Sequence, residues 1–193
     1  MGEAARREET ADLQTELARL RDELAEAQAR IAELQERADF DPLLNVLNRR
    51  GFERELARGI NYVQRYGTPA ALLFIDLDGF KLINDRHGHA AGDVLLKAVA
   101  AGLVGHLRAS DLVGRLGGDE FGVVLWNAKP AQAAAKARDL EQLIEALAGR
   151  HGADLLCVGA SAGLVAIVPG CAPEALIDAA DKAMYARKRE RHG

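Results

Sequence analysis

The chain has 193 residues, which corresponds to one domain or to one domain with a short appendage. Hydrophobic residues make up 49% and charged residues 28%, a composition typical of a folded protein. A formal net charge of −4 does not favour nucleic-acid binding, and neither a membrane span nor a secretory signal is visible, so we expect no nucleic-acid or membrane partner. Cys157 and Cys171 are too few for a disulfide framework, which favours a cytoplasmic location.

The first segment has the pattern of a coiled coil. Residues 1–40 hold 11 acidic residues against 6 basic ones. Its apolar residues are spaced alternately by four and three positions, and they are Leu13, Leu17, Leu20, Leu24, Ala27, Ile31 and Leu34. This heptad spacing predicts a parallel coiled-coil helix over residues 1–40, followed by a second domain over 41–193. The alternative is a single amphipathic helix that packs on its own domain.

The remaining chain alternates between helical and strand patterns. Residues 70–75 form a continuous apolar run, which is typical of a buried strand. In chain order we expect a helix over 51–66, a strand over 70–75, a helix over 90–107, strands over 112–116 and 121–126 joined at Gly117-Gly118, a helix over 130–149, a strand over 155–168 broken by Gly159 and Gly163, and a helix over 173–190. This order predicts an α/β (α+β) fold with a mixed central sheet flanked by helices.

Two pairs of carboxylates lie where strands are expected to end. Asp76 and Asp78 are two positions apart, so their side chains share one face of the extended backbone. Asp119 and Glu120 follow the two glycines of the expected hairpin turn. If the two strands are neighbours, Asp76 and Asp119 converge on a point that suits Mg²⁺ or Mn²⁺, which bind carboxylate oxygens and are often shared with substrate phosphates. The alternative is that acids and glycines simply belong to turns.

Several motifs occur together in residues 41–193. The sequence Arg-Leu-Gly-Gly-Asp-Glu-Phe occupies 115–121, and residues 76–96 read Asp-x-Asp-x-Phe-Lys-x-x-Asn-Asp-x-x-Gly-His-x-x-Gly-Asp-x-x-Leu. Both resemble motifs of the GGDEF family, the diguanylate cyclases. Residues 41–52 are similar to the family's first segment, Ser161 and Gly163 to its penultimate strand, and residues 180–185 to its last helix. The resemblance implies the nucleotide-cyclase-like GGDEF fold, here preceded by the coiled-coil helix.

The resemblance also implies a reaction in which two GTP molecules become cyclic di-GMP and two pyrophosphates. The 3′-hydroxyl of each GTP attacks the α-phosphate of the other, which depends on positioning and on the neutralisation of charge. By similarity, Asp76, the backbone carbonyl of Leu77 and Asp119 bind two Mg²⁺ (or Mn²⁺) ions per active site. Asp119 or Glu120 assists deprotonation of the hydroxyl, and the sequence leaves open which is a metal ligand and which a base.

Further residues of the long motif resemble the family's contacts to GTP. Phe80 and Lys81 begin a segment whose backbone amides and ammonium group would meet phosphates. Asn84 and Asp93 match positions that read guanine, because a carboxylate accepts from guanine's donors, whereas adenine would face it with an acceptor. His89 is expected to be a further substrate contact, and the alternative is a histidine that only completes a local turn.

Arg108 and Asp111 stand upstream of the glycine pair, at the offset of the family's inhibitory site, Arg-x-x-Asp. In such a site the guanidinium binds phosphate or guanine of the product and the carboxylate binds guanine. Cyclic di-GMP is therefore expected to be both product and inhibitor. The alternative is a solvated turn at the end of a helix.

Two segments depart from the family's pattern. Leu44 and Asn45 replace a Thr and a Gly that normally shape the start of the domain, so coupling from the N-terminal helix is expected to change more than the chemistry. Near the C-terminus, Lys188 keeps the lysine expected to face a phosphate of GTP, but His192 stands where an arginine is usual, with Arg191 beside it as a substitute. The expected consequence is a weaker affinity for the triphosphate.

The function expected from these features is an active diguanylate cyclase. Each domain supplies half of the site, so a homodimer through residues 1–40 raises the effective concentration of the two halves. We also expect an upstream sensor domain to be absent from this chain. The alternative is a regulatory module that binds GTP or cyclic di-GMP without turnover, although such relatives usually lose the acids that Asp76, Asp119 and Glu120 retain here.

Overall fold

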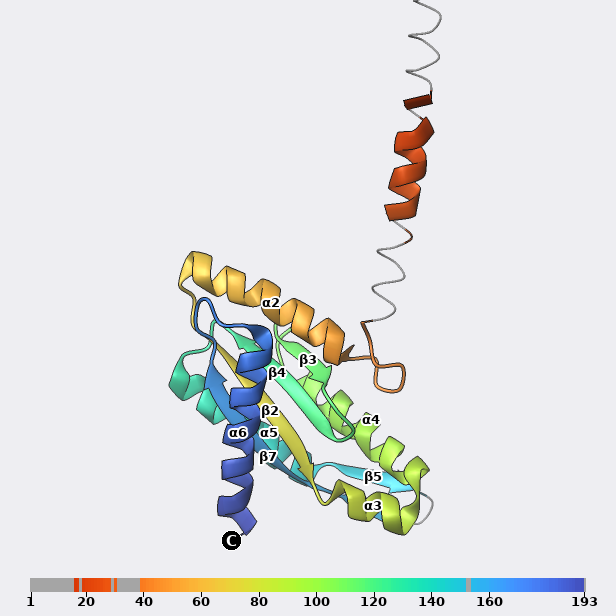
Figure 1. The fold of residues 1–193 in the computed structure, drawn as a ribbon. Coiled ribbons are helices and arrows are strands. Elements are labelled where there is room, and N and C mark those ends of the chain that lie inside the picture. The colour runs from red at the N-terminus through yellow and green to blue at the C-terminus, as the bar shows by residue number, and fades with distance from the viewer. Residues whose placement is uncertain (1–15, 18, 29, 31–38, 152–153, 193) are drawn as a thin grey trace, which may run out of the picture. The chain divides into compact units, whose positions relative to one another are not determined.

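The computed structural model describes residues 16–17, 19–28, 30, 39–151 and 154–192, and the chain divides into two units, residues 1–38 and 39–193 (Figure 1). In the first unit the described residues are helical, in line with the heptad pattern. Leu17, Leu20 and Leu24 are 48–58% exposed. Three other residues of the predicted seam lie outside the described residues, so the pairing of two such helices remains a prediction. None of the helices in the described part of the chain is long and apolar enough to cross a membrane.

The second unit is built on a five-stranded sheet. Its order is β1 (Leu47–Asn48), β3 (Leu112–Arg115), β4 (Glu120–Trp126), β2 (Ala70–Asp78) and β7 (Gly159–Ala166). β1 pairs with β3 in parallel and the other neighbours are antiparallel, which confirms the predicted mixed sheet. Because β2 lies between β4 and β7, residues from both of these strands flank the end of β2.

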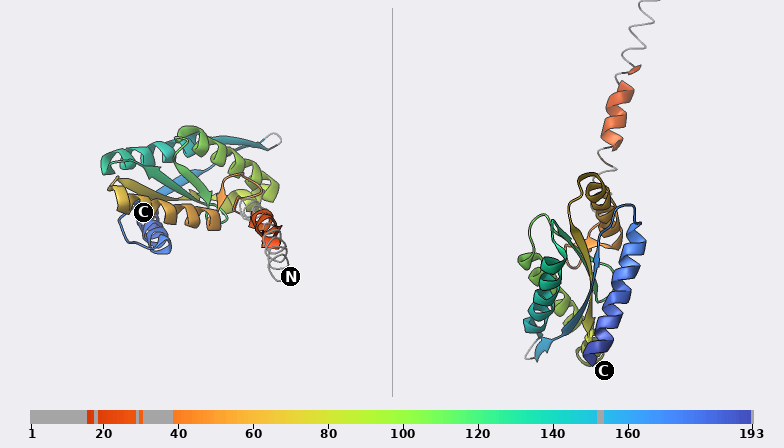
Figure 2. Two further views of the ribbon diagram at one scale, coloured as in Figure 1. Left: turned by 90° about the horizontal axis from the view of Figure 1, so that it is seen from above. Right: turned by 90° about the vertical axis from the view of Figure 1, so that its left-hand side faces the viewer.

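Helices cover both faces of the sheet, as Figure 2 shows. α2 (Arg49–Tyr66) and α6 (Pro173–His192) pack on one face. α4 (His89–His106) and α5 (Pro130–Ala146) pack on the other. The short helix α3 (Phe80–His87) connects β2 to α4.

The alternation of side chains along β2 decides which face each residue serves. Leu73 and Ile75 are buried in the core under α4 and α5, whereas Phe74 is buried in the core under α2 and α6. Successive residues of a strand point to opposite faces, so Asp76 and Asp78 share the face of Phe74. Both carboxylates therefore lie on the side of the sheet that α6 covers.

Two predicted elements are corrected by the structure. The strand expected over 155–168 is two strands that separate at Val158, namely β6 (Asp154–Cys157) and β7. β6 pairs with β5 (Ala148–His151) in a separate two-stranded sheet, so the helix expected over 130–149 ends at Ala146. No glycine marks this helix end, because its C-cap is an extended leucine, Leu147. Helix α3, which was not predicted, begins after Gly79, whose φ of 82° favours glycine.

Gly163 does not interrupt a strand, contrary to the expectation. It lies inside β7, opposite Phe74 of β2. A Cβ atom at this position would overlap the backbone O of Ala180 and the backbone N of Met184 in α6. The glycine therefore allows the backbone of α6 to approach the backbone of β7 directly.

The turn that precedes β1 forms even though Leu44 and Asn45 replace the family's Thr and Gly. Asn45 has a φ of 54°, and Asn adopts this left-handed region more readily than most residues with a side chain. Asp41 accepts hydrogen bonds through Oδ1 from the backbone N of Leu43 and of Leu44, both at 2.9 Å, and through its backbone O from Asn45 N at 2.9 Å. Altered coupling from the N-terminal helix remains a prediction.

The close approach at Gly163 generates a stability prediction. Gly163→Ala is expected to lower the free energy of unfolding by about 1–3 kcal/mol, because the added methyl overpacks the contact with α6. Gly105→Ala is the matched control: it lies in helix α4 with open space around an added Cβ, and it should stabilise the protein by about 0.5–1 kcal/mol. Urea unfolding of the three proteins measures both changes, and equal stability of the two variants would contradict the assignment.

Candidate active site

The two predicted carboxylate pairs meet at the ends of β2 and β4. The strands are neighbours, and their register places Asp76 opposite Glu120. The backbone N of Leu77 donates to the backbone O of Asp119 at 3.2 Å, which continues the pairing beyond the strand. The two strands are therefore neighbours, which is the condition under which the sequence predicts that Asp76 and Asp119 converge, and a metal ion bound between these two residues remains a prediction.

Burial and mutual repulsion make this cluster electrostatically unfavourable. Burial raises the pKa of Asp119 above its usual value, and the negative charge of Asp76 raises it further. Burial also raises the pKa of Glu120, with further contributions from Asp119, Asp76 and Asp181. Like charges held close together in a partly buried site favour protonation or the binding of a cation.

Lys188 of α6 supplies a positive charge to the first carboxylate pair. Its Nζ contacts Asp76 Oδ1 and lies 3.2 Å from Asp78 Oδ1. Burial lowers the pKa of Lys188, but the hydrogen bonds and charges of Asp76 and Asp78 together outweigh burial and raise it. Ser161 of β7 donates from Oγ to Asp78 Oδ2 at 2.9 Å. Lys188, which the sequence predicts to face a phosphate of GTP, thus contacts the carboxylates of Asp76 and Asp78 in this structure.

The glycine turn before Asp119 is held by an arginine whose contacts were not anticipated from the sequence. Arg115 donates from Nε to Gly117 O at 3.0 Å and from Nη2 to Gly118 O at 2.7 Å. Its Nη1 is 3.1 Å from Asp41 Oδ2, in the turn before β1. Arg115 therefore connects the start of the domain to the turn that carries the acids. The sequence did hold a sign that Arg115 belongs to the site, because Arg115 is the first residue of the motif at 115–121.

The predicted phosphate contacts begin α3. Phe80 is its first residue and is buried, so only its backbone can face a ligand. Lys81 follows and is exposed. The N-terminus of a helix presents free backbone N–H groups and favours anions.

The predicted guanine contacts lie on α3 and α4. The side chain of Asn84 packs against Gly92, where an added Cβ would overlap Asn84 Oδ1. Asn84 Oδ1 is buried and has no hydrogen-bond partner among the described residues, so this acceptor is unsatisfied there. Asp93 follows Gly92 and is half-buried, while His89 is exposed at the first position of α4.

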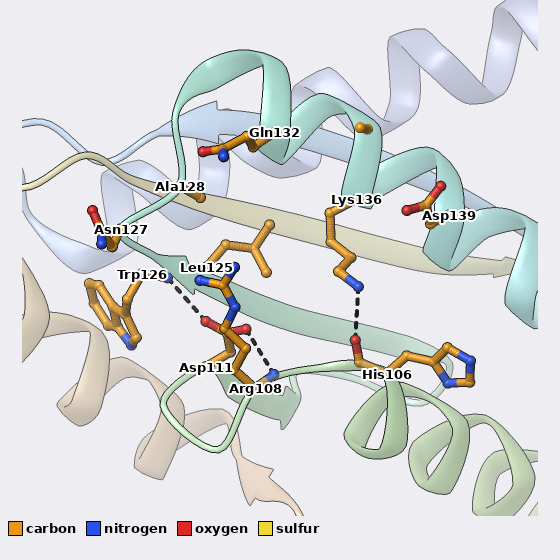
Figure 3. A pocket seen from close by; sticks show the side chains of 11 residues that line it. His106, Arg108, Asp111, Leu125, Trp126, Asn127, Ala128, Gln132, Lys136 and Asp139 are labelled. Atoms are coloured by element: carbon orange, nitrogen blue, oxygen red, sulfur yellow. Dashed lines mark hydrogen bonds between the residues drawn. The ribbon is translucent and has the colours of Figure 1, made fainter.

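Arg108 and Asp111 lie in the turn between α4 and β3, at the opposite end of β4 from Glu120 (Figure 3). Asp111 accepts hydrogen bonds from Arg108 N at 3.1 Å and from Trp126 N at 3.2 Å. A cavity of about 350 Å³ opens beside them, and its charged and polar lining includes Lys136, whose Nζ donates to His106 O at 2.8 Å. The carboxylate of Asp111 therefore accepts hydrogen bonds from two backbone N–H groups and also lines the cavity.

The carboxylate cluster fits a metal ion that is shared with a substrate. In the part of the chain that the structure describes, no three His, Cys, Asp or Glu side chains form a complete metal site. Mg²⁺ is usually held by one or two carboxylates, and phosphates and water complete its coordination. Asp76 and Asp119 match that donor set, and the ammonium group of Lys188 between Asp76 and Asp78 indicates that this place attracts a cation.

Residues 38–193 match the family model "Diguanylate cyclase, GGDEF domain". The chain is 42% identical over 161 residues to the diguanylate cyclase TpbB of Pseudomonas aeruginosa, a match that spans 81% of this chain and 37% of that protein. It is 37% identical over 151 residues to the diguanylate cyclase DosC of Escherichia coli, spanning 77% of this chain and 33% of that protein. The chain thus spans about a third of the length of these relatives.

One of the similar solved structures matches most of this chain. The coiled coil and GGDEF domain of DgcB from Caulobacter crescentus, in complex with c-di-GMP, has a TM-score of 0.77 and is 26% identical. The match covers 92% of this chain and 95% of that one.

The crowding of carboxylates generates a pH-dependent stability prediction. Because the folded protein raises the pKa of Asp119, ionisation of this group destabilises the fold as the pH rises above the ordinary value of 3.8. Asp119→Asn should therefore raise the melting temperature by a few degrees at pH 7.5 without divalent metal, and the gain should vanish as the pH falls below that value. Differential scanning fluorimetry at a series of pH values measures it.

The control for this prediction is Asp85→Asn, which removes an exposed carboxylate from α3 and should change the melting temperature little. A loss of stability in Asp119→Asn at pH 7.5 would contradict the electrostatic interpretation of the cluster.

Proposed function

The chain belongs to the diguanylate cyclase GGDEF-domain family, and on that premise we propose that it condenses two GTP molecules into cyclic di-GMP with release of two pyrophosphates. The observation that carries this proposal is the convergence of Asp76, Asp119 and Glu120 at the ends of β2 and β4. A site that transfers a phosphoryl-type group needs negative oxygens that bind cations beside a place for phosphates.

In each half of the reaction a bond forms between the 3′-oxygen of one GTP and the α-phosphorus of the other. The bond from that phosphorus to the oxygen of the β-phosphate breaks, and pyrophosphate leaves. Asp76, Asp119 and the carbonyl of Leu77 would hold two divalent ions per site, either Mg²⁺ or Mn²⁺. When bound, these ions neutralise the charge of the phosphates and of the attacking oxygen. Glu120 or Asp119 takes the proton of the hydroxyl, and a raised pKa suits a carboxylate to that task.

The residues around the acids would orient the triphosphate and the base. Backbone N–H groups at the start of α3, around Phe80 and Lys81, face the phosphates, and so does Lys188, whose ammonium group contacts Asp76. Asn84 and Asp93 bind guanine, and the buried Oδ1 of Asn84, which has no hydrogen-bond partner among the described residues, supports this role. His89 is proposed as a further contact at the start of α4.

The proposed reaction needs two copies of the domain, because each copy binds one GTP. We propose a homodimer through the helix of residues 1–40, which raises the local concentration of the second domain. The chain spans about a third of the length of these two curated relatives, and we propose that an input domain upstream of this chain controls the enzyme. The ion pair between Asp41 and Arg115 lies between the start of the domain and the glycine turn, where such an input would arrive.

We further propose that cyclic di-GMP inhibits the enzyme at the cavity beside Arg108 and Asp111. The guanidinium of Arg108 and the ammonium of Lys136 suit the two phosphates of the product (Figure 3). The carboxylate of Asp111 would accept from guanine. The one tryptophan of the chain, Trp126, lines the same cavity and offers a direct optical reporter of binding.

The activity itself is tested by incubating the protein with GTP and Mg²⁺ and separating the products by chromatography. The wild-type chain should form cyclic di-GMP and pyrophosphate in a ratio of one to two, and Asp119→Ala should lower the rate by at least about a hundredfold. Asp178→Asn, an exposed carboxylate on α6, is the control and should keep the wild-type rate. A dimeric wild-type protein, free of bound nucleotide, that forms no product would favour the non-catalytic binding module instead.

Inhibition is tested with the fluorescence of Trp126. Cyclic di-GMP should change the emission of the wild-type protein in a saturable way. Arg108→Ala should raise the half-saturating concentration of cyclic di-GMP roughly tenfold or more, because a charge-assisted hydrogen bond to phosphate is lost. Arg65→Ala, at the exposed end of α2, should leave the titration unchanged. Unchanged binding by Arg108→Ala would place the product elsewhere.

A further inference from the structure

Glu141 is a buried carboxylate that the proposed reaction does not use. It lies in α5, is 6% exposed, and accepts two hydrogen bonds from different parts of the fold. Its Oε1 accepts from the backbone N of Ala162 in β7 at 3.0 Å, and its Oε2 accepts from Arg187 Nη2 in α6 at 3.1 Å. Because α5 and α6 cover opposite faces of the sheet, Glu141 links the two faces around the edge strand β7.

The two partners named above, Ala162 and Arg187, are each the neighbour of a residue in the carboxylate site. Ala162 follows Ser161, which donates to Asp78. Arg187 precedes Lys188, whose ammonium group lies between the two carboxylates of β2. A displacement of either partner would therefore displace a side chain that contacts the site.

The rotation of α6 about its own axis decides where Lys188 points. The helix touches β7 at Gly163, through the backbone of Ala180 and Met184, and Lys188 lies one helical turn after Met184. Consecutive helical residues point about 100° apart, so fixing Arg187 on one side of β7 directs Lys188 to the other.

Packing alone does not hold Arg187 in place. Its side chain is 42% exposed, and a groove of about 280 Å³ lies beside the ion pair, lined by Glu141, Ala162, Ala183 and Arg187 among others. The pKa of Arg187 is raised by its hydrogen bond to Glu141 and by the charge of that carboxylate. The ion pair, rather than the surrounding side chains, directs the guanidinium.

We propose that Glu141 is a positioning residue, which acts through Arg187 to direct Lys188 onto the carboxylates and thereby onto the phosphates of bound GTP. The inference rests on the proposed function, since it assigns Glu141 a part in binding the same triphosphate. It differs from a purely structural role because it couples Glu141 to Lys188 and to ligand affinity.

The test uses Glu141→Gln, which keeps an acceptor for the backbone N of Ala162 but removes the charge that holds Arg187. Affinity is measured by calorimetry with Mg²⁺ and a GTP analogue in which a methylene group replaces the oxygen between the α- and β-phosphorus, because this bond cannot break in the reaction. Glu141→Gln and Lys188→Met should each weaken binding roughly tenfold, the effect of one lost charge-assisted contact. The double variant should bind no more weakly than Lys188→Met alone.

The way in which the two losses of affinity combine separates a positioning role from a merely structural one. A merely structural Glu141 would weaken binding by the same factor with and without Lys188, so the two losses would multiply, which would overturn the proposal. Asp178→Asn, which breaks an exposed ion pair with Lys182 on the same helix, is the matched control and should leave affinity unchanged. If Glu141→Gln fails to fold, Arg187→Gln removes the same ion pair by replacing its partner, whose side chain is 42% exposed. This variant should show the same non-additivity with Lys188→Met.

The outcomes also separate this inference from the proposed function. A wild-type protein that does not bind the analogue would overturn both. Wild-type binding together with an unchanged affinity in Glu141→Gln would overturn the positioning role alone.

Discussion

The central constraint on this molecule is the concentration of negative charge at the ends of β2 and β4. Asp76, Asp119 and Glu120 lie close enough that burial and mutual repulsion raise the pKa of both Asp119 and Glu120. A fold that holds such a cluster must supply positive charge or leave a place for it. Lys188 supplies part of it here, because its ammonium group lies on Asp76 and Asp78. The negative charge that Lys188 does not balance supports the proposal that the site binds a cation together with a triphosphate.

The geometry of the sheet brings these groups together. Because successive side chains of β2 point to opposite faces of the sheet, Asp76 and Asp78 lie on the face that α6 covers. Helix α6 can lie close to β7 because Gly163 has no side chain. Antiparallel pairing of β2 with β4 then brings the glycine turn to the same end of the sheet. The turn is held by Arg115, which also binds Asp41 at the start of the domain. The same contacts that satisfy local hydrogen bonds thus place the acids.

The sequence predicted the parts of this arrangement that depend on local pattern. The apolar run of β2 and the spacing of Asp76 and Asp78 indicated a strand with two acids on one face, and the structure agrees. Contacts between distant segments were not accessible in this way. The sequence contains no periodic signal that Gly163 faces a helix rather than interrupting a strand, or that Arg115 reaches Asp41. Ends of elements without a glycine cap, such as the end of α5, were also misplaced.

The most direct test of the central claim is to count bound Mn²⁺ by electron paramagnetic resonance with the methylene analogue of GTP present. The account predicts that the wild-type protein takes up Mn²⁺ together with the nucleotide, and that Asp76→Asn loses most of this uptake, because the substitution removes one of the two carboxylates proposed to bind the ion. Full uptake of Mn²⁺ by Asp76→Asn would contradict the claim that the crowded carboxylates of β2 and β4 form the cation site.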